Sequence, residues 1–380
     1  MSVVVIDPAT GGVAGLYLDA YAKAASTREV TIVGAYASLS SAPVERYFYK
    51  RTDLANGGRQ RFGKLRMPLR YMELIQGLIR SLLLIIRIRP KAVFYALSSN
   101  LMPELLFVLT LRLFRIPIHV ICHDVVPFVG ARENRALKDA QRRQFYRFAN
   151  RLICHNRRSL VELRDRYGIA ADKLDYLPFP LMDIRPLAQQ HATQTERSRL
   201  SVPRVRFLFI GHMRPEKGVN LLINAWRKAT SRLPGGELVI AGQVPAGERI
   251  VSTDGIPRLT ILDNYIDEQS YVHLIDEADV VVLPYLAGTN SGVLSNVVSL
   301  SKLVIVSDIA MFPESGLVDD TSTFAAGEVN ALVDRLVEYG TMSAAQRRGK
   351  AEAVERIRDH RMELFSSAFD AILRHITPAG

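Results

Sequence analysis

The chain has 380 residues, of which 48% are hydrophobic, and it carries a formal net charge of +11 with a pI near 9.7. This length is too great for one ordinary core and predicts two domains of roughly 150–200 residues each, while the ordinary glycine and proline content excludes a largely disordered chain. The positive charge predicts an acidic partner, which could be nucleic acid, an anionic membrane or a phosphorylated substrate.

Only two cysteines occur, Cys122 and Cys154, each within an apolar run. They are too few for a disulfide framework, so we expect a reducing, cytosolic compartment. Each precedes a histidine, which suggests zinc, but their spacing matches no common zinc finger, and two buried strands that end alike explain the pattern as well. The first residues lack the basic region of a signal peptide, and no apolar stretch reaches the ~18–20 residues of a membrane span. We therefore expect a soluble or peripheral protein.

The first half of the chain alternates apolar runs with segments of helical period, as α/β domains do. Strands are predicted at residues 3–6, 31–35, 92–96, 118–122, 151–155 and 174–178, and helices at residues 16–25, 101–114, 138–148 and 159–167, the last capped by Ser159. Two loops follow predicted strands at the edge where parallel sheets bind ligands: the glycine loop at Gly11 and Gly12, and the pair His123 and Asp124. Each has a purely structural alternative, as a tight turn or as a buried polar pair.

The segment from Arg59 to Lys91 is both basic and apolar. It holds a single acid, Glu73, against the basic residues Arg59, Arg61, Lys64, Arg66, Arg70, Arg80, Arg87, Arg89 and Lys91. The interleaved apolar residues predict a helix that lies on anionic lipid, with its cations at the headgroups. A core helix with a solvated basic face is the alternative.

A polar stretch at residues 183–203 predicts a linker, after which a second alternating series begins. Its strands are predicted at residues 207–210, 237–241, 259–262, 280–284 and 303–307. Its helices are predicted at residues 219–230, at residues 268–277, after the run 285–294 as far as about residue 300, and at residues 343–375. We therefore expect two doubly wound sheets facing each other across a cleft. The expected domains are residues 1–182 and 204–358, with residues 359–380 returning to the first.

Two loops of the second half combine into a possible anion site. The loop after strand 207–210 holds His212, Arg214 and Lys217, and the run from Gly288 to Val293 lies between a strand and a helix. Free N–H groups at helix N-termini attract anions, and two cations beside them would hold and neutralise a diphosphate leaving group. No Gly-x-x-x-x-Gly-Lys-[Ser/Thr] run occurs, so a P-loop ATPase is not expected.

These motifs together resemble a family. The Gly-Gly-Val loop, His123-Asp124, the pattern Gly-x-x-Arg-Pro-x-Lys-Gly and Ser-Gly-Val-Leu before a helix are similar to GT-B glycosyltransferases of the large GT4 class, the glycosyl transferases group 1, of the bacterial surface-polysaccharide type. The similarity covers nearly the whole chain and is most specific at residues 207–218 and 283–308. It implies transfer of a sugar, a hexosyl group, from a nucleotide-sugar donor, without a required metal or other cofactor and with retention at the anomeric carbon.

The resemblance also implies roles for individual residues. The donor diphosphate would be bound by Arg214 and Lys217 and by groups at Ser291, Gly292 and Val293; Gly12 would approach it, His123 would bond the donor sugar, and Tyr265 and Ile266 would line the base. The chain departs from the family in two places. His212 stands where an arginine is usual, and neither of two common glutamates occurs between Gly288 and Asn296, although Asn296 could bond a ribose hydroxyl. A catalytic dyad of His123 and Asp124 is our inference, separate from the family pattern.

The basic apolar segment predicts an acceptor at the membrane, such as a glycan or a polyprenyl-diphosphate-linked saccharide. The expected protein is thus cytoplasmic and peripheral at the inner face of the plasma membrane. The alternative is a catalytically inactive GT-B-like partner subunit or binding protein, as the missing glutamates would permit. A nucleic-acid partner is not expected, because the basic residues lack a regular interleaved aromatic platform.

Overall fold

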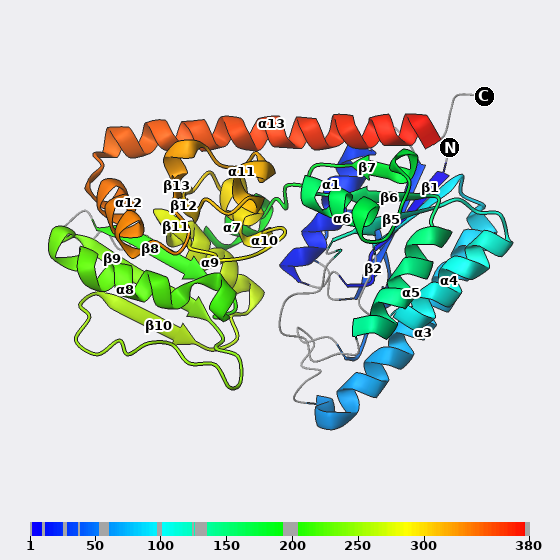
Figure 1. Ribbon diagram of the computed structural model, residues 1–380, viewed down its shortest axis with the longest axis horizontal. Coiled ribbons are helices and arrows are strands. Elements are labelled where there is room, and N and C mark those ends of the chain that lie inside the picture. Colours follow the sequence, from blue (N-terminus) through cyan, green and yellow to red (C-terminus); the bar gives the residue numbers. More distant parts are fainter. Residues whose placement is uncertain are drawn as a thin grey trace. The chain divides into compact units, whose positions relative to one another are not determined.

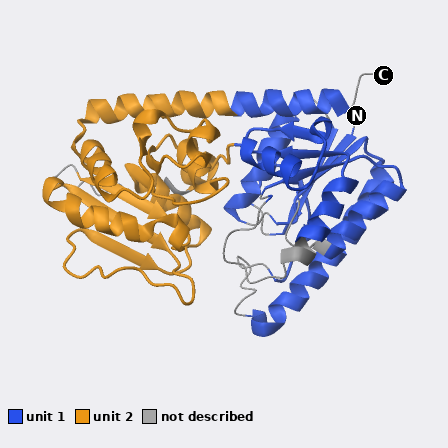
Figure 2. Ribbon diagram, viewed as in Figure 1, with its two compact units in different colours: residues 1–180, 362–380 blue, residues 181–361 orange. Residues whose placement is uncertain are grey.

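The computed structural model describes residues 2–9, 12–25, 29–36, 39–52, 61–96, 101–123, 125, 135–192 and 204–376 (Figure 1). The chain forms two compact units, one of Met1–Pro180 with Met362–Gly380 and the other of Leu181–Arg361 (Figure 2). Each is a parallel sheet with helices on its faces, so the predicted pair of doubly wound sheets is confirmed. The cleft between them stays a prediction.

The first unit is built on a seven-stranded sheet in the order β3-β2-β1-β4-β5-β6-β7, with every pair parallel. Its strands are β1 (Ser2–Ile6), β2 (Glu29–Ala35), β3 (Val44–Phe48), β4 (Ala92–Ala96), β5 (Ile118–Cys122), β6 (Arg151–Cys154) and β7 (Leu174–Tyr176). The central strands are buried on both faces, which explains why they read in the sequence as unbroken apolar runs. The edge strand β3 contains charged as well as apolar residues and was not predicted.

Helices cover both faces of this sheet. They are α1 (Leu16–Ala24), α3 (Arg66–Ile88), α4 (Leu101–Leu113), α5 (Arg135–Phe148) and α6 (Arg157–Asp165). Helices α3, α4 and α5 lie side by side (Figure 1) and share one core with Val4, Ile6 and Tyr95 of the sheet. On the opposite face, Phe94 packs edge-on against Phe369. The prediction that Ser159 caps α6 was wrong: Asn156 is the N-cap, and its side chain accepts the Ser159 N–H at 2.7 Å.

The second unit has a six-stranded parallel sheet in the order β10-β9-β8-β11-β12-β13. Its strands are β8 (Val205–Ile210), β9 (Gly236–Gly242), β10 (Leu259–Asp263), β11 (Val280–Leu283), β12 (Leu303–Ser307) and β13 (Thr323–Phe324). Its helices are α7 (Arg185–Ala192), α8 (Val219–Ala229), α9 (Glu268–Glu277), α10 (Gly292–Ser299), α11 (Met311–Ser315), α12 (Val329–Thr341) and the first part of α13 (Ala344–Ile376). The strand order reverses between β8 and β11, which is the topological switch point where doubly wound sheets bind ligands.

The segment expected to be a linker begins as part of the second unit. The backbone N–H groups of Met182 and Ile184 donate to the hydroxyls of Ser295 and Ser299 on α10, and α7 follows directly. Residues 193–203 of the expected linker lie outside the described residues. The segment is polar because α7 exposes much of its surface. This polar composition is the reason why the sequence predicted a linker.

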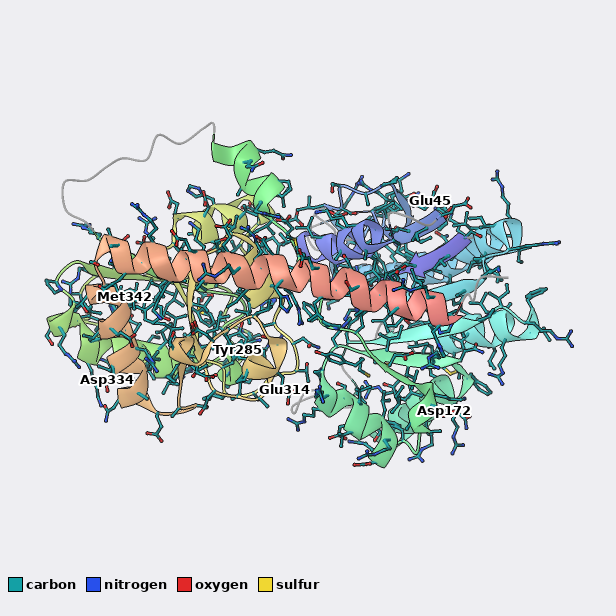
Figure 3. The ribbon with its side chains drawn as sticks, turned by 90° about the horizontal axis from the view of Figure 1, so that it is seen from above. Glu45, Asp172, Tyr285, Glu314, Asp334 and Met342 are labelled. Atoms are coloured by element: carbon teal, nitrogen blue, oxygen red, sulfur yellow. The ribbon has the colours of Figure 1, made fainter. Side chains whose placement is uncertain are left out.

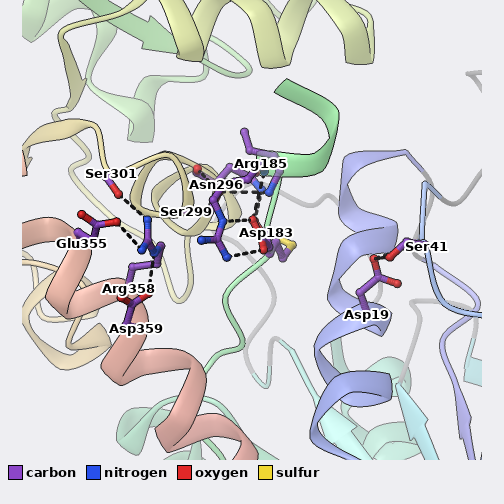
Figure 4. A network of polar contacts seen from close by, with 12 residues as sticks. Asp19, Ser41, Asp183, Arg185, Asn296, Ser299, Ser301, Glu355, Arg358 and Asp359 are labelled. Carbon is purple, nitrogen blue, oxygen red and sulfur yellow. Dashed lines mark hydrogen bonds and ion pairs between the residues drawn. The ribbon is translucent and has the colours of Figure 1, made fainter. Parts of the chain in front are cut away.

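The long C-terminal helix α13 belongs to both units by contact. Residues up to Arg361 pack with the second unit, where Arg358 donates to Ser301 at 2.8 Å and pairs with Glu355 (Figure 4). From residue 362 it packs with the first unit, where Phe365 and Phe369 meet the Tyr21 ring at centroid distances of 5.1 and 4.9 Å. The helix thus passes from the second unit to the first between Arg361 and Met362.

Candidate functional site

The loops that follow β8 and β11 touch each other at the switch point of the second sheet. The backbone N–H of Leu286 donates to the Glu216 carbonyl at 2.8 Å. Gly218, the N-cap of α8, has φ 70°, and a Cβ there would lie 1.9 Å from the Pro284 carbonyl oxygen. Because no side chain fits at this approach, glycine is what allows the two loops to meet.

Lys217 reaches the second loop through Tyr285. Its Nζ lies 3.7 Å from the centroid of the Tyr285 ring, a cation–π distance. Tyr285 is only 1% exposed and lies within the second unit (Figure 3). Burial raises the pKa of Tyr285 to about 12, so the phenol keeps its proton at neutral pH. Lys217 therefore contacts the loop that leads from β11 to α10.

Ser291 begins α10 and leaves part of its first turn for a ligand. The Ser291 hydroxyl accepts the Leu294 N–H at 3.2 Å. The N–H groups of Gly292 and Val293 precede this bond in the first turn, where a helix offers no intrahelical acceptor. A Cβ on Gly292 would lie 2.8 Å from Met182 Cε, so the turn is closely packed on one side. Such a helix start favours an anion.

The loop after β8 is positively charged. Arg214 pairs with Glu216 at 3.3 Å and keeps 43% of its side chain exposed. Burial, and then the charges of Arg214 and Lys217, lower the pKa of His212, so this imidazole is neutral at pH 7. The part of this pKa shift that comes from the two cations reflects a positive potential, which attracts an anion to the same place. The cations of the site are therefore Arg214 and Lys217.

Asn296 does not lie where a ribose could reach it, contrary to our expectation. The side chain is 2% exposed; its Nδ2 donates to the Met182 carbonyl at 3.0 Å, and its Oδ1 accepts the Tyr271 hydroxyl at 3.0 Å. Both ends of the amide are thus used within the unit. Asn296 ties α10 to the start of the unit and to α9.

Tyr265 and Ile266 follow β10, at the carboxyl edge that also carries the loop after β8. The Asn264 N–H donates to the Gly242 carbonyl at the end of β9, which holds this loop at that edge. Tyr265 is 54% exposed, as a residue that stacks on a base would be before binding.

The position of the first missing glutamate is covered by the side chain of Met311. A Cβ on Gly288 would lie 2.4 Å from the Met311 sulfur. Met311 is 8% exposed and belongs to α11, so a carboxylate at residue 288 would require it to move. The departure from the family pattern is therefore built into the packing.

In the first unit, His123 follows β5 and Gly12 follows β1. His123 Nε2 lies 3.7 Å from a carboxylate oxygen of the buried Asp7, and its ring is 4.9 Å from that of Tyr17. Gly12 has φ 61°, and its carbonyl accepts the Gly15 N–H at 2.8 Å where the chain turns toward α1. Asp124 lies outside the described residues, so the predicted dyad stays a prediction.

The sequence analysis predicted no role for Tyr17 and His155, whose rings lie next to that of His123. His155 Nδ1 donates to the Leu177 carbonyl at 2.9 Å, which leaves Nε2 to accept the Tyr17 hydroxyl at 2.6 Å. Burial raises the pKa of Tyr17 well above its ordinary value, so this hydroxyl stays a donor. Asp7 and His155 each follow a buried strand directly, as His123 does, and that shared position was the available signal.

The two cysteines occupy register-paired positions. Cys122 and Cys154 are buried free thiols opposite each other on β5 and β6. Within the described part of the chain, no three His, Cys, Asp or Glu side chains gather in a way that could hold a metal ion.

Part of the chain is similar in sequence to a known family, and the whole chain is similar in structure to solved proteins. Residues 204–340 match the sequence model of the family described as glycosyl transferases group 1. A search of curated proteins found no match. Among solved structures, a glycosyltransferase from Rickettsia africae ESF-5 is 12% identical with a TM-score of 0.66, the match covering 100% of this chain and 99% of that one.

The names of two further structures include a uridine nucleotide. HepE of Anabaena in complex with UDP-glucose is 15% identical with a TM-score of 0.63, covering 98% of this chain and 99% of that one. A UDP-forming α,α-trehalose-phosphate synthase from Burkholderia xenovorans is 16% identical with a TM-score of 0.63, covering 100% and 99%. Identities this low show a shared fold, and the fold extends over the whole chain.

Proposed function

We propose, for a chain with the GT-B fold of the glycosyl transferases group 1, that it moves a sugar from a nucleotide-sugar donor to a glycan or lipid-linked saccharide acceptor. The observation that carries the proposal is the contact of Lys217 with Tyr285, beside the start of α10. This contact combines a cation with a nearby helix N-terminus at the switch point of a doubly wound sheet. Such sheets bind ligands at this point, and both groups favour a diphosphate.

The chemistry follows from the charges. When the bond between the anomeric carbon and the diphosphate breaks, negative charge develops on the leaving diphosphate. Lys217, Arg214 and the N–H groups of Gly292 and Val293 would meet that charge in positions fixed before the reaction, which is the most effective form of electrostatic catalysis. Neutral His212 would donate or accept one further hydrogen bond without adding charge.

The finer parts of the proposal concern the sugar and its acceptor. We propose a hexosyl group, transferred with retention at its anomeric carbon, with His123 bonding a hydroxyl of the donor sugar and Gly12 close to its diphosphate. Tyr265 and Ile266 would contact the base. The reaction belongs to polysaccharide assembly at the cytoplasmic side of the plasma membrane in this proposal, and it uses no metal.

The test compares two lysines of the same unit. Lys217→Ala should lower kcat/KM for transfer or donor hydrolysis about 10²–10³-fold, the usual effect of removing one preorganised donor. Lys228→Ala on α8 is the control, because Lys228 is exposed and donates to Asn330 on α12. The donor would first be identified by thermal stabilisation with a panel of nucleotide sugars, beginning with UDP sugars. Unchanged turnover in Lys217→Ala, beside an active wild type, would remove the diphosphate assignment.

A second function is favoured by the closed position at Gly288. Without a carboxylate there, the protein could bind a donor and serve as an inactive partner subunit. In that case nucleotide sugars would stabilise the protein against heat, but neither hydrolysis nor transfer would be detected at any acceptor concentration.

A further inference from the structure

Helix α3 has two apolar faces. One is buried against the sheet and consists of Leu74, Gly77, Leu78, Ser81 and Ile85. The other is exposed and consists of Met72, Ile75, Ile79, Leu83 and Ile86, with Met72 56%, Ile79 54% and Leu83 62% accessible. At about 100° per residue, the exposed row lies roughly 140° around the helix from the buried one. A surface helix normally presents charged residues there, so this face is adapted to something other than water.

Helix α4 adds a second exposed apolar row. It lies beside α3 (Figure 1) and exposes Met102, Leu106, Leu113 and the following Phe114, with Leu113 81% accessible. Apolar side chains scattered singly over a surface need no explanation, but two rows on adjacent helices do. We call this surface, formed by the exposed apolar residues of α3 and α4, the α3–α4 face.

The exposed charged residues of α3 and α4 are all basic. Both carboxylates of these helices are engaged elsewhere: Glu73 accepts the N–H groups of Arg51 and Thr52, and Glu104 is fully buried and accepts the Tyr95 hydroxyl. The exposed cations of α3 and of the residues directly before and after it are Arg61, Lys64, Arg80, Arg87, Arg89 and Lys91.

We propose that the α3–α4 face is a docking surface for a bilayer of anionic lipids. The apolar rows would enter the boundary between headgroups and acyl chains, and the cations would contact lipid phosphates. Charge decides against a second copy of the chain, since two such faces would bring Arg80 and Arg87 against each other. None of the helices that the structure describes is both long and apolar enough to cross a bilayer.

The direction of α3 connects this surface to the ligand edge of its own sheet. Because α3 leads into β4, its last residue lies near the beginning of the strands and its first near their carboxyl ends. With 23 residues α3 is about 35 Å long, against about 17 Å for the five residues of β4, so its N-terminal turns extend past the sheet (Figure 1). Those turns expose Leu65 and Met67, 66% and 65% accessible. Resting on the proposed function, this arrangement would bring a lipid-linked acceptor to the edge that carries His123.

Flotation with vesicles tests the proposal on the full chain. Wild type should float with phosphatidylcholine vesicles that contain phosphatidylglycerol and much less with phosphatidylcholine alone. Ile79→Glu with Leu83→Glu should abolish flotation. Arg80→Glu with Arg87→Glu should weaken it at least 10-fold, because each basic residue near an anionic surface contributes about fivefold.

The controls use the same unit. Val161→Glu with Leu364→Glu places two acids at positions that are also exposed, 46% and 40%, but on α6 and α13. This control should float like wild type, and so should Lys217→Ala, whose loss of turnover then tests the proposed function separately. Wild type that fails to float, or equal losses in the α6–α13 control, would overturn the proposal. So would a dimer in solution that the Ile79→Glu, Leu83→Glu variant dissociates.

Discussion

Substituting Gly218 by alanine tests the approach of the two loops on which the diphosphate site depends. The added Cβ would lie 1.9 Å from the Pro284 carbonyl oxygen, a backbone atom that cannot rotate away. Gly255 provides a matched control: it lies in the same unit and has the same φ of 70°, but no atom lies within 4 Å of its would-be Cβ. The two substitutions therefore share the left-handed strain and differ in the clash.

The magnitudes follow from these two terms. Gly255→Ala should lower the free energy of unfolding by about 1–2 kcal/mol, the cost of a left-handed alanine. Gly218→Ala should lose that amount plus about 1–3 kcal/mol, because backbone must move to relieve the overlap. Moving the loop would also carry Lys217 off the Tyr285 ring. Donor-dependent turnover should fall in Gly218→Ala alone.

Urea denaturation of both variants gives the comparison directly, and thermal stabilisation by a nucleotide sugar reports on the site. The expected result is a larger loss for Gly218→Ala than for Gly255→Ala, together with weaker stabilisation by the donor. Equal losses and equal donor response would show that the loops after β8 and β11 do not need their contact, and the site built on it would have to be abandoned.

Two other substitutions probe the interior. Asn296→Ala should cost about 1–3 kcal/mol of stability by leaving the Met182 carbonyl and the Tyr271 hydroxyl without their partner, yet leave the affinity for a donor unchanged; a weakened Kd would restore the ribose contact. Burial lowers the pKa of His119 to about 4, against about 6.5 in an unfolded chain. The unfolded state then binds more protons below pH 6.5, and this residue should cost about 2 kcal/mol of stability between pH 7 and pH 5. His119→Leu should remove that part of the pH dependence, measured by urea denaturation at both pH values, and an identical slope in wild type and variant would contradict the assignment.

The sequence predicted the fold well wherever a strand is buried on both faces. Strands β4, β5 and β12 begin and end at the predicted residues, because a parallel strand covered by helices must be apolar throughout. The sequence did not predict the elements that are only partly buried or that carry polar residues. The edge strand β3 carries charged residues, and α7 looked like a linker because none of its side chains from Arg185 to Gln190 is fully buried.

The candidate site divides in the same way. A short loop after a strand cannot leave the carboxyl edge of its sheet, so the positions of Arg214, Lys217 and Ser291 along the chain were enough to predict their shared edge. Which way a polar side chain turns was not predictable. Asn296 reads as a possible ligand in sequence, yet packing turned both ends of its amide inward.

By itself, then, the sequence determined the buried strands of both sheets, the edge at which the cations gather and the basic character of α3, since these depend on local period and composition. Only the tertiary structure decided that Gly218 must accommodate Pro284, that Met311 closes the place of a missing carboxylate, and that α3 remains apolar on the side away from its sheet. These depend on which atoms meet across distant parts of the chain, and neither periodicity nor composition carries that information.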